Sequence, residues 1–239
     1  MAIRRQLTAK DVALTVSFTA LYVVFGFLKI SPIIGLPGQA ISAAAIMAPI
    51  MGILLGPQMS TLATFTGGII GFSLGSFSSP SFASGTFAAL CAGLTHNGKR
   101  TISTIVYLSL LLLLALYPNI GAAWLYPQVM WFQIIGLIIL ISPLQSMATE
   151  NLDNSSKLLY GFFITSLTST LAGQIAGSLT LEILTANADS WIATWQVITF
   201  LYPIERIIIA LAAALVGVSL LKVLKSANMM PLDHAKSQK

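Results

Sequence analysis

Charged residues are scarce in this sequence of 239 residues. Asp, Glu, Lys and Arg make up 8% of the chain, against about 25% in an average soluble domain. Hydrophobic residues make up 56% and the mean hydropathy is +0.88. Such a chain has too little polar surface for a soluble fold, so we expect an integral membrane protein in contact with the lipid bilayer. The net charge of +5 is then no argument for nucleic acid binding, and no nucleic-acid-binding motif is present.

Cysteine and histidine are equally rare. The single cysteine, Cys91, excludes a disulfide within the chain, and we expect it to be buried. The two histidines, His96 and His234, lie far apart and lack a carboxylate at ligand spacing, so no metal site is expected. Motifs of zinc peptidases, serine hydrolases and P-loop ATPases are also missing. We therefore expect no catalysis, no cofactor and no ATP hydrolysis by the chain itself.

Long apolar runs are what the sequence does contain. A helix that crosses a bilayer needs about 20 residues, and Pro, Gly and Asn turn signals divide the chain at roughly this spacing. The predicted spans are residues 11–30, 39–55, 58–75, 81–95, 101–116, 122–141, 157–184 and 203–224. Pro203 is expected to begin the last span, and residues 190–202 to form an outer amphipathic or re-entrant piece.

The expected fold class is all-α: a polytopic transmembrane helical bundle of about eight spans. It forms a single domain over residues 1–226, followed by a short cytoplasmic tail, 227–239. Because no long polar linker interrupts the apolar runs, nothing predicts a second domain.

Basic residues are distributed unevenly across these spans. When the chain is threaded alternately through the bilayer, ten of the twelve fall on one side: Arg4, Arg5, Lys10, Lys99, Arg100, Lys157, Lys222, Lys225, Lys236 and Lys239. The positive-inside rule then places both termini in the cytoplasm, and we expect a plasma membrane location. The exceptions, Lys29 and Arg206, fall near the opposite surface with Glu182, Asp189 and Glu205.

These outer charges are candidate site residues, because charges in membrane segments are rare and tend to be functional. The charged substrate-binding candidates are Lys29, Glu182, Glu205 and Arg206. Simpler explanations stay open, since Lys29 can snorkel at its span end and Glu205 suits a helix N-terminus. Adjacent residues point about 100° apart on a helix, so Glu205 and Arg206 are expected to find separate partners. The hypothesis pairs Arg206 with Glu182, and Glu205 with Lys29 or a bound solute.

Aromatic residues gather near the same surface. Most fit the interfacial belt of membrane proteins: Trp124, Tyr126, Trp131, Trp191, Trp195 and Tyr202. The alternative is a planar ligand that stacks on one or two rings and bonds to Gln39, Gln128 or Gln196. On that alternative, Trp124, Trp195, Tyr202 and Gln39 are further substrate-binding candidates.

One stretch carries a family resemblance. Residues 48–57 read Ala-Pro-Ile-Met-Gly-Ile-Leu-Leu-Gly-Pro, and the next span contains Gly67, Gly68 and Gly71. This pattern resembles the substrate-binding S components of energy-coupling factor transporters. Similar to that family are also a small-residue stripe on the first span (Ala9, Ala13 and Ser17), a Pro- and Gly-rich outer loop at 31–39, and Pro203-x-Glu205 near the last span.

The resemblance implies capture of a small, vitamin-like solute from outside by a six-helix core, with an additional helix pair in the region 122–184. It also implies a transmembrane coupling subunit, docked on Ala9, Ala13 and Ser17, and two ATPase subunits that drive uptake. The chain departs from the family in its eight predicted spans and in Ser60, where glycine is common. Two other classes stay open: a noncatalytic structural subunit of a larger membrane complex, and a self-sufficient carrier, which the lack of mid-span charges disfavours.

Overall fold

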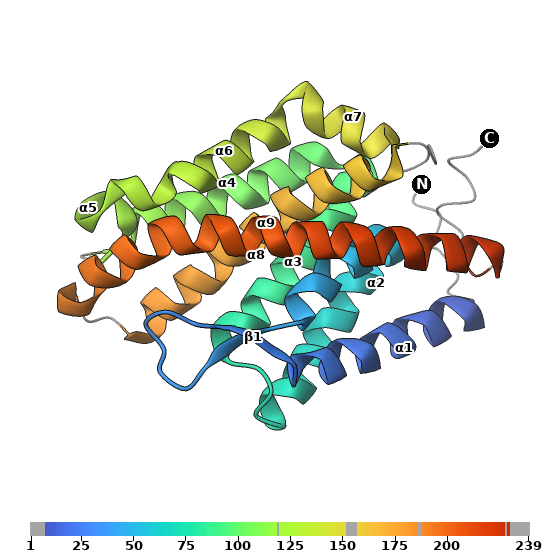
Figure 1. The fold of residues 1–239 in the computed structure, drawn as a ribbon, viewed down its shortest axis with the longest axis horizontal. Coiled ribbons are helices and arrows are strands. Elements are labelled where there is room, and N and C mark those ends of the chain that lie inside the picture. Colours follow the sequence, from blue (N-terminus) through green and yellow to red (C-terminus); the bar gives the residue numbers. More distant parts are fainter. Residues whose placement is uncertain (1–7, 119, 152–156, 186–187, 228, 230–239) are drawn as a thin grey trace, which may run out of the picture.

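The computed structural model describes residues 8–118, 120–151, 157–185, 188–227 and 229. The structure is 83% helical, which confirms the all-α class (Figure 1). In chain order the elements are α1 (Ala9–Gly26), β1 (Lys29–Pro32), β2 (Ala40–Ser42), α2 (Ala44–Ser73), α3 (Ser79–His96), α4 (Arg100–Leu116), α5 (Ala122–Leu125), the 3-10 helix η1 (Pro127–Met130), α6 (Trp131–Ile141), α7 (Pro143–Asn151), α8 (Leu158–Thr185) and α9 (Ala188–Ser226). Of the predicted tail 227–239, only Ala227 and Met229 are among the described residues.

Several of these helices are long and apolar enough to cross a membrane. Four meet that criterion: α1, α2, α8 and the stretch Trp191–Ser226 of α9. A fifth arises if Pro127–Ile141 and Pro143–Glu150, bent by 62° at their junction, count as one span. Large apolar side chains such as Val16 and Phe200 face outward, as contact with lipid requires. The described part of the chain thus has four or five helices suited to crossing a membrane, as in a helical membrane protein, and the predicted eight crossings are not confirmed.

The Gly-Pro turn predicted between the second and third spans lies inside α2. Gly56 has φ 75° and ψ 174°, a left-handed conformation that glycine adopts without steric strain. α3 crosses α2 closely at this break. A Cβ on Gly93 would come within 2.5 Å of the Pro57 nitrogen, and one on Gly52 would lie equally near the Ala92 side chain. The two predicted spans therefore form one broken helix, and glycines hold it against α3.

The prediction that Pro203 begins a separate helix is wrong, because α9 continues through Pro203 for 39 residues. A proline has no N–H, so the carbonyl four residues earlier, at Thr199, lacks its helical donor. The indole Nε1 of Trp131 donates to that carbonyl oxygen at 3.0 Å. Residues 190–202 therefore belong to the first part of α9 and do not form a separate piece. A donor from α6 satisfies the carbonyl that the proline leaves unpaired.

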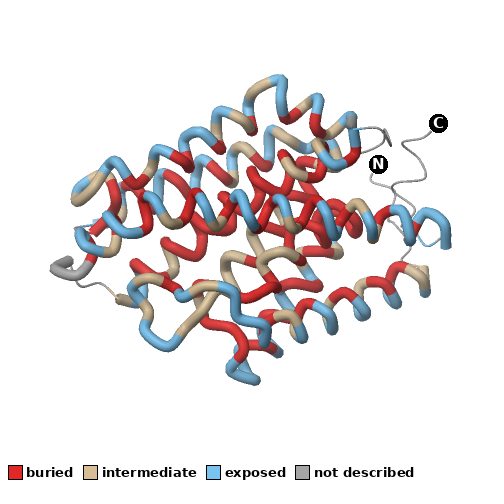
Figure 2. Tube along the Cα trace, viewed as in Figure 1, coloured by how far each residue is buried: buried red, intermediate tan, exposed pale blue. Residues whose placement is uncertain are grey.

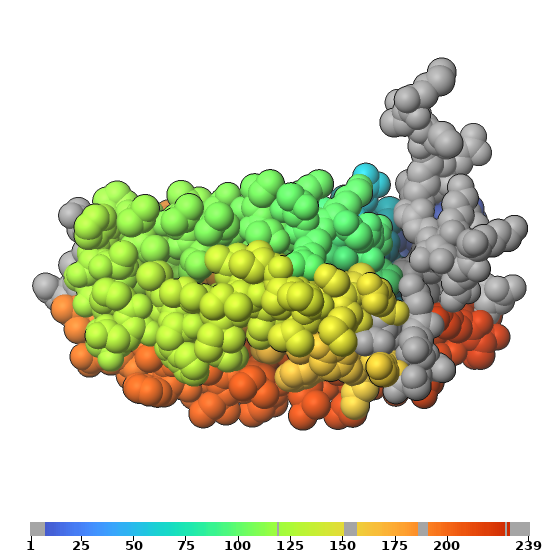
Figure 3. Space-filling view, turned by 90° about the horizontal axis from the view of Figure 1, so that it is seen from above, coloured from blue at the N-terminus to red at the C-terminus, as the bar shows by residue number. Residues whose placement is uncertain are grey.

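The bundle is built around α8. Its most apolar window is 83% buried, and it contacts α2, α3, α4, α6, α7 and α9. Figure 2 shows the buried residues concentrated on these inner helices, whereas α1 and α9 expose one face along their length. Of the region 122–184, predicted to hold an additional helix pair, only α5 to α7 form a layer with α4, whereas α8 is the central helix. Figure 3 shows α4 to α7, green to yellow, covering one face of the molecule.

The helix ends divide between two ends of the bundle. α1 begins, α8 begins and α9 ends at the same end (Figure 1). The antiparallel hairpin of β1 and β2 follows the far end of α1, in the segment expected to be an outer loop. The described chain ends thus lie at the same end of the bundle, and which end faces the cytoplasm stays a prediction.

Candidate solute-binding cavity

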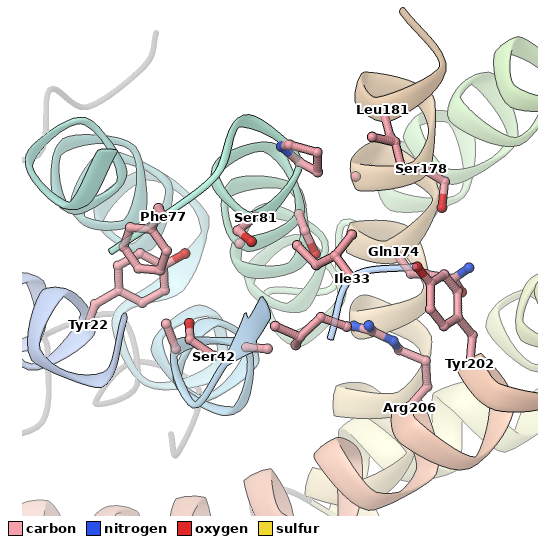
Figure 4. Close-up of a pocket in the computed structure, with 17 residues that line it drawn as sticks. Tyr22, Ile33, Ser42, Phe77, Ser81, Gln174, Ser178, Leu181, Tyr202 and Arg206 are labelled. Atoms are coloured by element: carbon pink, nitrogen blue, oxygen red, sulfur yellow. The ribbon is translucent and has the colours of Figure 1, made fainter. Parts of the chain in front are cut away.

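A cavity lies beneath the hairpin, between α1, α3, α8 and α9. It encloses about 580 Å³ of empty space, part of it open to solvent. Figure 4 shows Tyr22 and Phe77 on one side and Gln174 and Tyr202 on the other, with Arg206 reaching from α9 towards the space between them. The polar residues of its wall are Tyr22, Ser42, Ser81, Ser84, Gln174, Ser178, Tyr202 and Arg206.

The hairpin covers the cavity because its turn can bend back onto the bundle. Gly35 and Gly38 both have positive φ, 85° and 79°, which L side chains rarely adopt. The turn closes with a backbone bond from the Ile33 nitrogen to the Gln39 oxygen at 3.0 Å. A Cβ on Gly35 would lie 3.4 Å from a methyl of Thr194 and 3.6 Å from one of Leu181, so the turn rests on α8 and α9.

The uncharged wall is arranged by contacts behind it. Tyr22 is buried, and its hydroxyl lies against Gly85, where any larger residue would clash. Its ring packs on Phe77, with 5.1 Å between the centroids. Gln133 holds Gln174 in place. The Gln133 side-chain nitrogen donates to the Val129 oxygen at 2.7 Å, and its side-chain oxygen accepts from Gln174 Nε2 at 2.9 Å. The wall thus offers fixed hydroxyl and amide groups in an otherwise apolar hollow.

Among the described residues, Arg206 is the one charged residue that lines the cavity. Its side chain is 4% exposed, and its Nη2 lies 3.9 Å from Glu205 Oε2. Its Cζ lies 5.7 Å from the centroid of the Tyr202 ring, within the range of a cation–π contact. Its Nε is buried without a hydrogen-bond partner among the described residues.

Neither predicted ion pair, Arg206 with Glu182 or Glu205 with Lys29, is formed among the described residues. Glu205 and Arg206 contact each other, whereas neither Glu182 carboxylate oxygen has a hydrogen-bond partner in the described part of the chain. Glu205 accepts a hydrogen bond from the Ser31 hydroxyl. Lys29, exposed at the end of the bundle, donates to the Ser76 backbone oxygen at 2.8 Å. Glu205 and Arg206 approach each other in spite of the 100° between them, because the Arg206 side chain is long and flexible.

Of the aromatic and amide candidates, only one lines the cavity. Tyr202 lines the cavity, but Trp195 lies in the core, where its Nε1 donates to the Ile120 oxygen at 3.3 Å. Trp124 is 62% exposed, and Gln39 belongs to the hairpin turn without lining the cavity. The structure therefore brings Tyr202, Arg206 and, behind them, Glu205 together, and it leaves Trp124, Trp195 and Gln39 outside the site.

Sequence reasoning missed most of the polar wall, including Tyr22, Ser42, Ser81 and Ser178. Serine hydroxyls inside helices usually bond to their own backbone, so they carry little signal. Gln174 was the detectable one, since an amide in the middle of an apolar span requires a buried partner.

The predicted docking stripe lies on the outside of α1. Ala9, Ala13 and Ser17 are all exposed, while Leu14 and Phe18 face the core. No described helix covers the stripe, so it is free to meet lipid or another protein.

Cys91 is buried and free, as expected. In the described ranges, no cluster of three or more His, Cys, Asp or Glu residues could hold a metal ion. Comparison with protein families, with curated proteins and with solved structures finds no match.

Proposed function

We propose that this chain is the membrane-embedded, solute-binding subunit of a transporter, and that it captures a small solute at the end of the bundle that carries the hairpin. One observation carries the proposal: a partly open cavity beneath the hairpin has a wall of fixed polar groups and one buried guanidinium. Concave, mostly apolar sites with a few oriented polar groups are typical of small-molecule binding.

The cavity also supports the resemblance to S components of energy-coupling factor transporters. All residues that line it come from α1, the hairpin, α2, the segment between α2 and α3, α3, α8 and α9. Counting the two halves of α2 separately, these helices would correspond to the six-helix core, and α4 with α5 to α7 to the additional pair. On this proposal the solute is vitamin-like, and the exposed stripe of Ala9, Ala13 and Ser17 receives a transmembrane coupling subunit.

A carrier that works alone fits less well. Such a protein needs a polar path to the opposite side. Between the cavity and the opposite end, however, glycines bring helices into backbone contact, with Gly173 of α8 against Ser84 and Gly93 of α3 against Pro57. Since the sequence contains no P-loop motif, the energy for uptake would come from two separate ATPase subunits.

The orientation is part of the proposal. On this proposal the chain lies in the plasma membrane. The predicted excess of basic residues on one side then puts both termini in the cytoplasm. The cavity then opens to the exterior, where a solute to be imported is met.

The test is purification of the full chain from its own membranes under mild conditions. We expect two nucleotide-hydrolysing subunits and one further membrane subunit to co-purify, and native mass spectrometry to detect a retained small molecule. Transport by the purified chain alone in lipid vesicles would reject the proposal in favour of a carrier. A stable assembly without nucleotide-hydrolysing subunits or bound solute would favour a structural subunit.

A further inference from the structure

We infer that the cavity recognises a negatively charged group of its solute, a carboxylate or a phosphate, through the guanidinium of Arg206. The inference rests on the proposed function, because it takes the cavity to be a solute site. It adds the chemical class of the solute, which the proposed function leaves open.

Arg206 has unused hydrogen-bonding capacity. A guanidinium has five N–H donors and no acceptor. The 3.9 Å separation of Arg206 Nη2 and Glu205 Oε2 exceeds the hydrogen-bond range of about 2.7–3.2 Å. Among the described residues, the buried Nε also lacks a partner. The second contact of the guanidinium is with the ring of Tyr202, which accepts no in-plane N–H bond.

A buried guanidinium nitrogen without a hydrogen-bond partner, as Nε of Arg206 is among the described residues, is unusual, because desolvation is compensated only when the group is paired and bonded. Arg206 is 4% exposed and lies on the cavity wall. A ligand in the cavity is therefore the available source of the missing acceptors.

The electrostatic surroundings favour an anion. Arg206 is the only charged side chain among the described residues that line the cavity. The nearest carboxylate, Glu205, accepts from Ser31 of the hairpin and does not line the cavity. The other described acid on these helices near the cavity, Glu182, follows Leu181 on α8 but does not line the wall either. Lys29 adds a second positive charge at the same end of the bundle, where its ammonium holds the Ser76 oxygen.

The geometry suits a carboxylate or phosphate in particular. The planar fork of a guanidinium matches two oxygens of either group with parallel hydrogen bonds. The Tyr202 contact restricts the orientation of that plane. Hydroxyls of Ser42 and Ser178 and the amide of Gln174 are available on the same wall for the uncharged part of the solute.

The first arm of the test identifies what the purified full chain retains. Native mass spectrometry, followed by extraction and mass analysis, is applied to the wild type, Arg206→Gln, Arg206→Lys and the control Arg100→Gln. Arg100 is a matched control, because its guanidinium bonds to Ser146 and to the Ile141 oxygen, outside the cavity. We expect an anionic small molecule in the wild type and in Arg100→Gln, and at least a tenfold loss in Arg206→Gln.

The identity of the retained molecule separates the two proposals. A neutral or cationic solute would overturn anion recognition and leave solute capture standing. A phospholipid that Arg206→Gln loses would support anion recognition and overturn solute capture.

The second arm uses defined probes at constant ionic strength: benzoate, inorganic phosphate and the neutral analogue benzamide. We expect benzoate or phosphate to raise the unfolding temperature of the wild type and of Arg100→Gln in a saturable way. Arg206→Lys keeps the charge but not the planar fork, so it should need at least tenfold more anion for the same shift in unfolding temperature. The unfolding temperature of Arg206→Gln should not change. Three results would overturn the inference. Neither anion raises the unfolding temperature of the wild type, benzamide raises it as much as the anions do, or the anions raise that of Arg206→Gln as much as that of the wild type.

Discussion

Trp131 supplies the hydrogen bond that Thr199 loses to Pro203: its indole nitrogen lies 3.0 Å from the Thr199 carbonyl oxygen. This contact joins α6 to the middle of α9 and lets α9 continue through a proline. The satisfied carbonyl matters more in a membrane than in water, since hydrocarbon offers no replacement partner.

Trp131→Phe should therefore destabilise the bundle by about 1–2 kcal/mol, the effect of leaving one buried carbonyl unsatisfied. Chemical unfolding in micelles measures it, with the exposed Trp124→Phe as the control. Pro203→Ala restores a backbone N–H to Thr199, so the loss should be smaller in the double variant. Equal losses with and without Pro203 would show that Trp131 acts through packing instead.

Gly93→Ala should weaken the crossing of α2 and α3. The new methyl would lie 2.5 Å from the Pro57 nitrogen, and backbone atoms there have no room to move. We expect a destabilisation of about 1–3 kcal/mol, typical of overpacking. Gly217→Ala is the comparison, since it meets the ring of Phe162, a side chain that is able to rotate. A larger effect at position 217 would contradict the rigid-crossing argument.

Ser31→Ala should loosen the hairpin, because the Ser31 hydroxyl donates to Glu205 on α9. A hydrogen bond to a charged group contributes about 1.5–3 kcal/mol, so exchange of the backbone amides of residues 33–39 should become at least tenfold faster. Ser73→Ala, which removes an exposed bond within one helix, serves as the control. Unchanged exchange in Ser31→Ala would mean that the hairpin is held by its contacts with Thr194 and Leu181 alone.

Ala13→Leu should break the docking of α1 to a partner subunit without unfolding the chain. The site is exposed, and exposed substitutions usually change stability by less than about 0.5 kcal/mol. We expect at least a tenfold loss of the co-purifying membrane subunit. Val12→Leu, at the neighbouring exposed position, should keep it. If both variants still co-purify with the membrane subunit, the stripe is not part of the interface.

Glu182→Gln should leave solute retention unchanged and should stabilise the fold. The Glu182 side chain is fully buried, and both of its oxygens lack hydrogen-bond partners among the described residues. An uncharged amide of nearly the same shape carries a smaller desolvation penalty. We expect a gain of about 1 kcal/mol by thermal unfolding, with the exposed Glu150→Gln neutral. Lost retention would return Glu182 to the site, as the sequence had predicted.

The helices that the sequence predicted well are those whose ends depend on local signals. The observed α3, α4 and α8 begin and end within two residues of the predicted spans, because apolar runs and turn residues act locally. The break at Gly56-Pro57 was found for the same reason.

Other predictions failed because the contacts that decide them cannot be read from the local sequence. Pro203 looked like a helix start, because no local residue reveals that Trp131 would satisfy Thr199. The segment 31–39 was expected to be a loop between helices that reach residue 30 and begin at residue 39. Instead α1 ends at Gly26, and residues 29–32 and 40–42 pair as two strands. The contacts of the charged residues were missed because they depend on side-chain conformations: Glu205 accepts from Ser31, and Arg206 lies near Glu205.

The narrow attachment of α1 has a practical consequence. Only 28% of its apolar window is buried, and a seam of Leu14, Phe18 and Tyr22 holds it to the bundle. Tyr22 is at once part of that seam and part of the cavity wall. A harsh detergent that detaches this helix would also remove one side of the cavity wall, so solubilisation in native lipid patches is the condition that keeps the cavity intact.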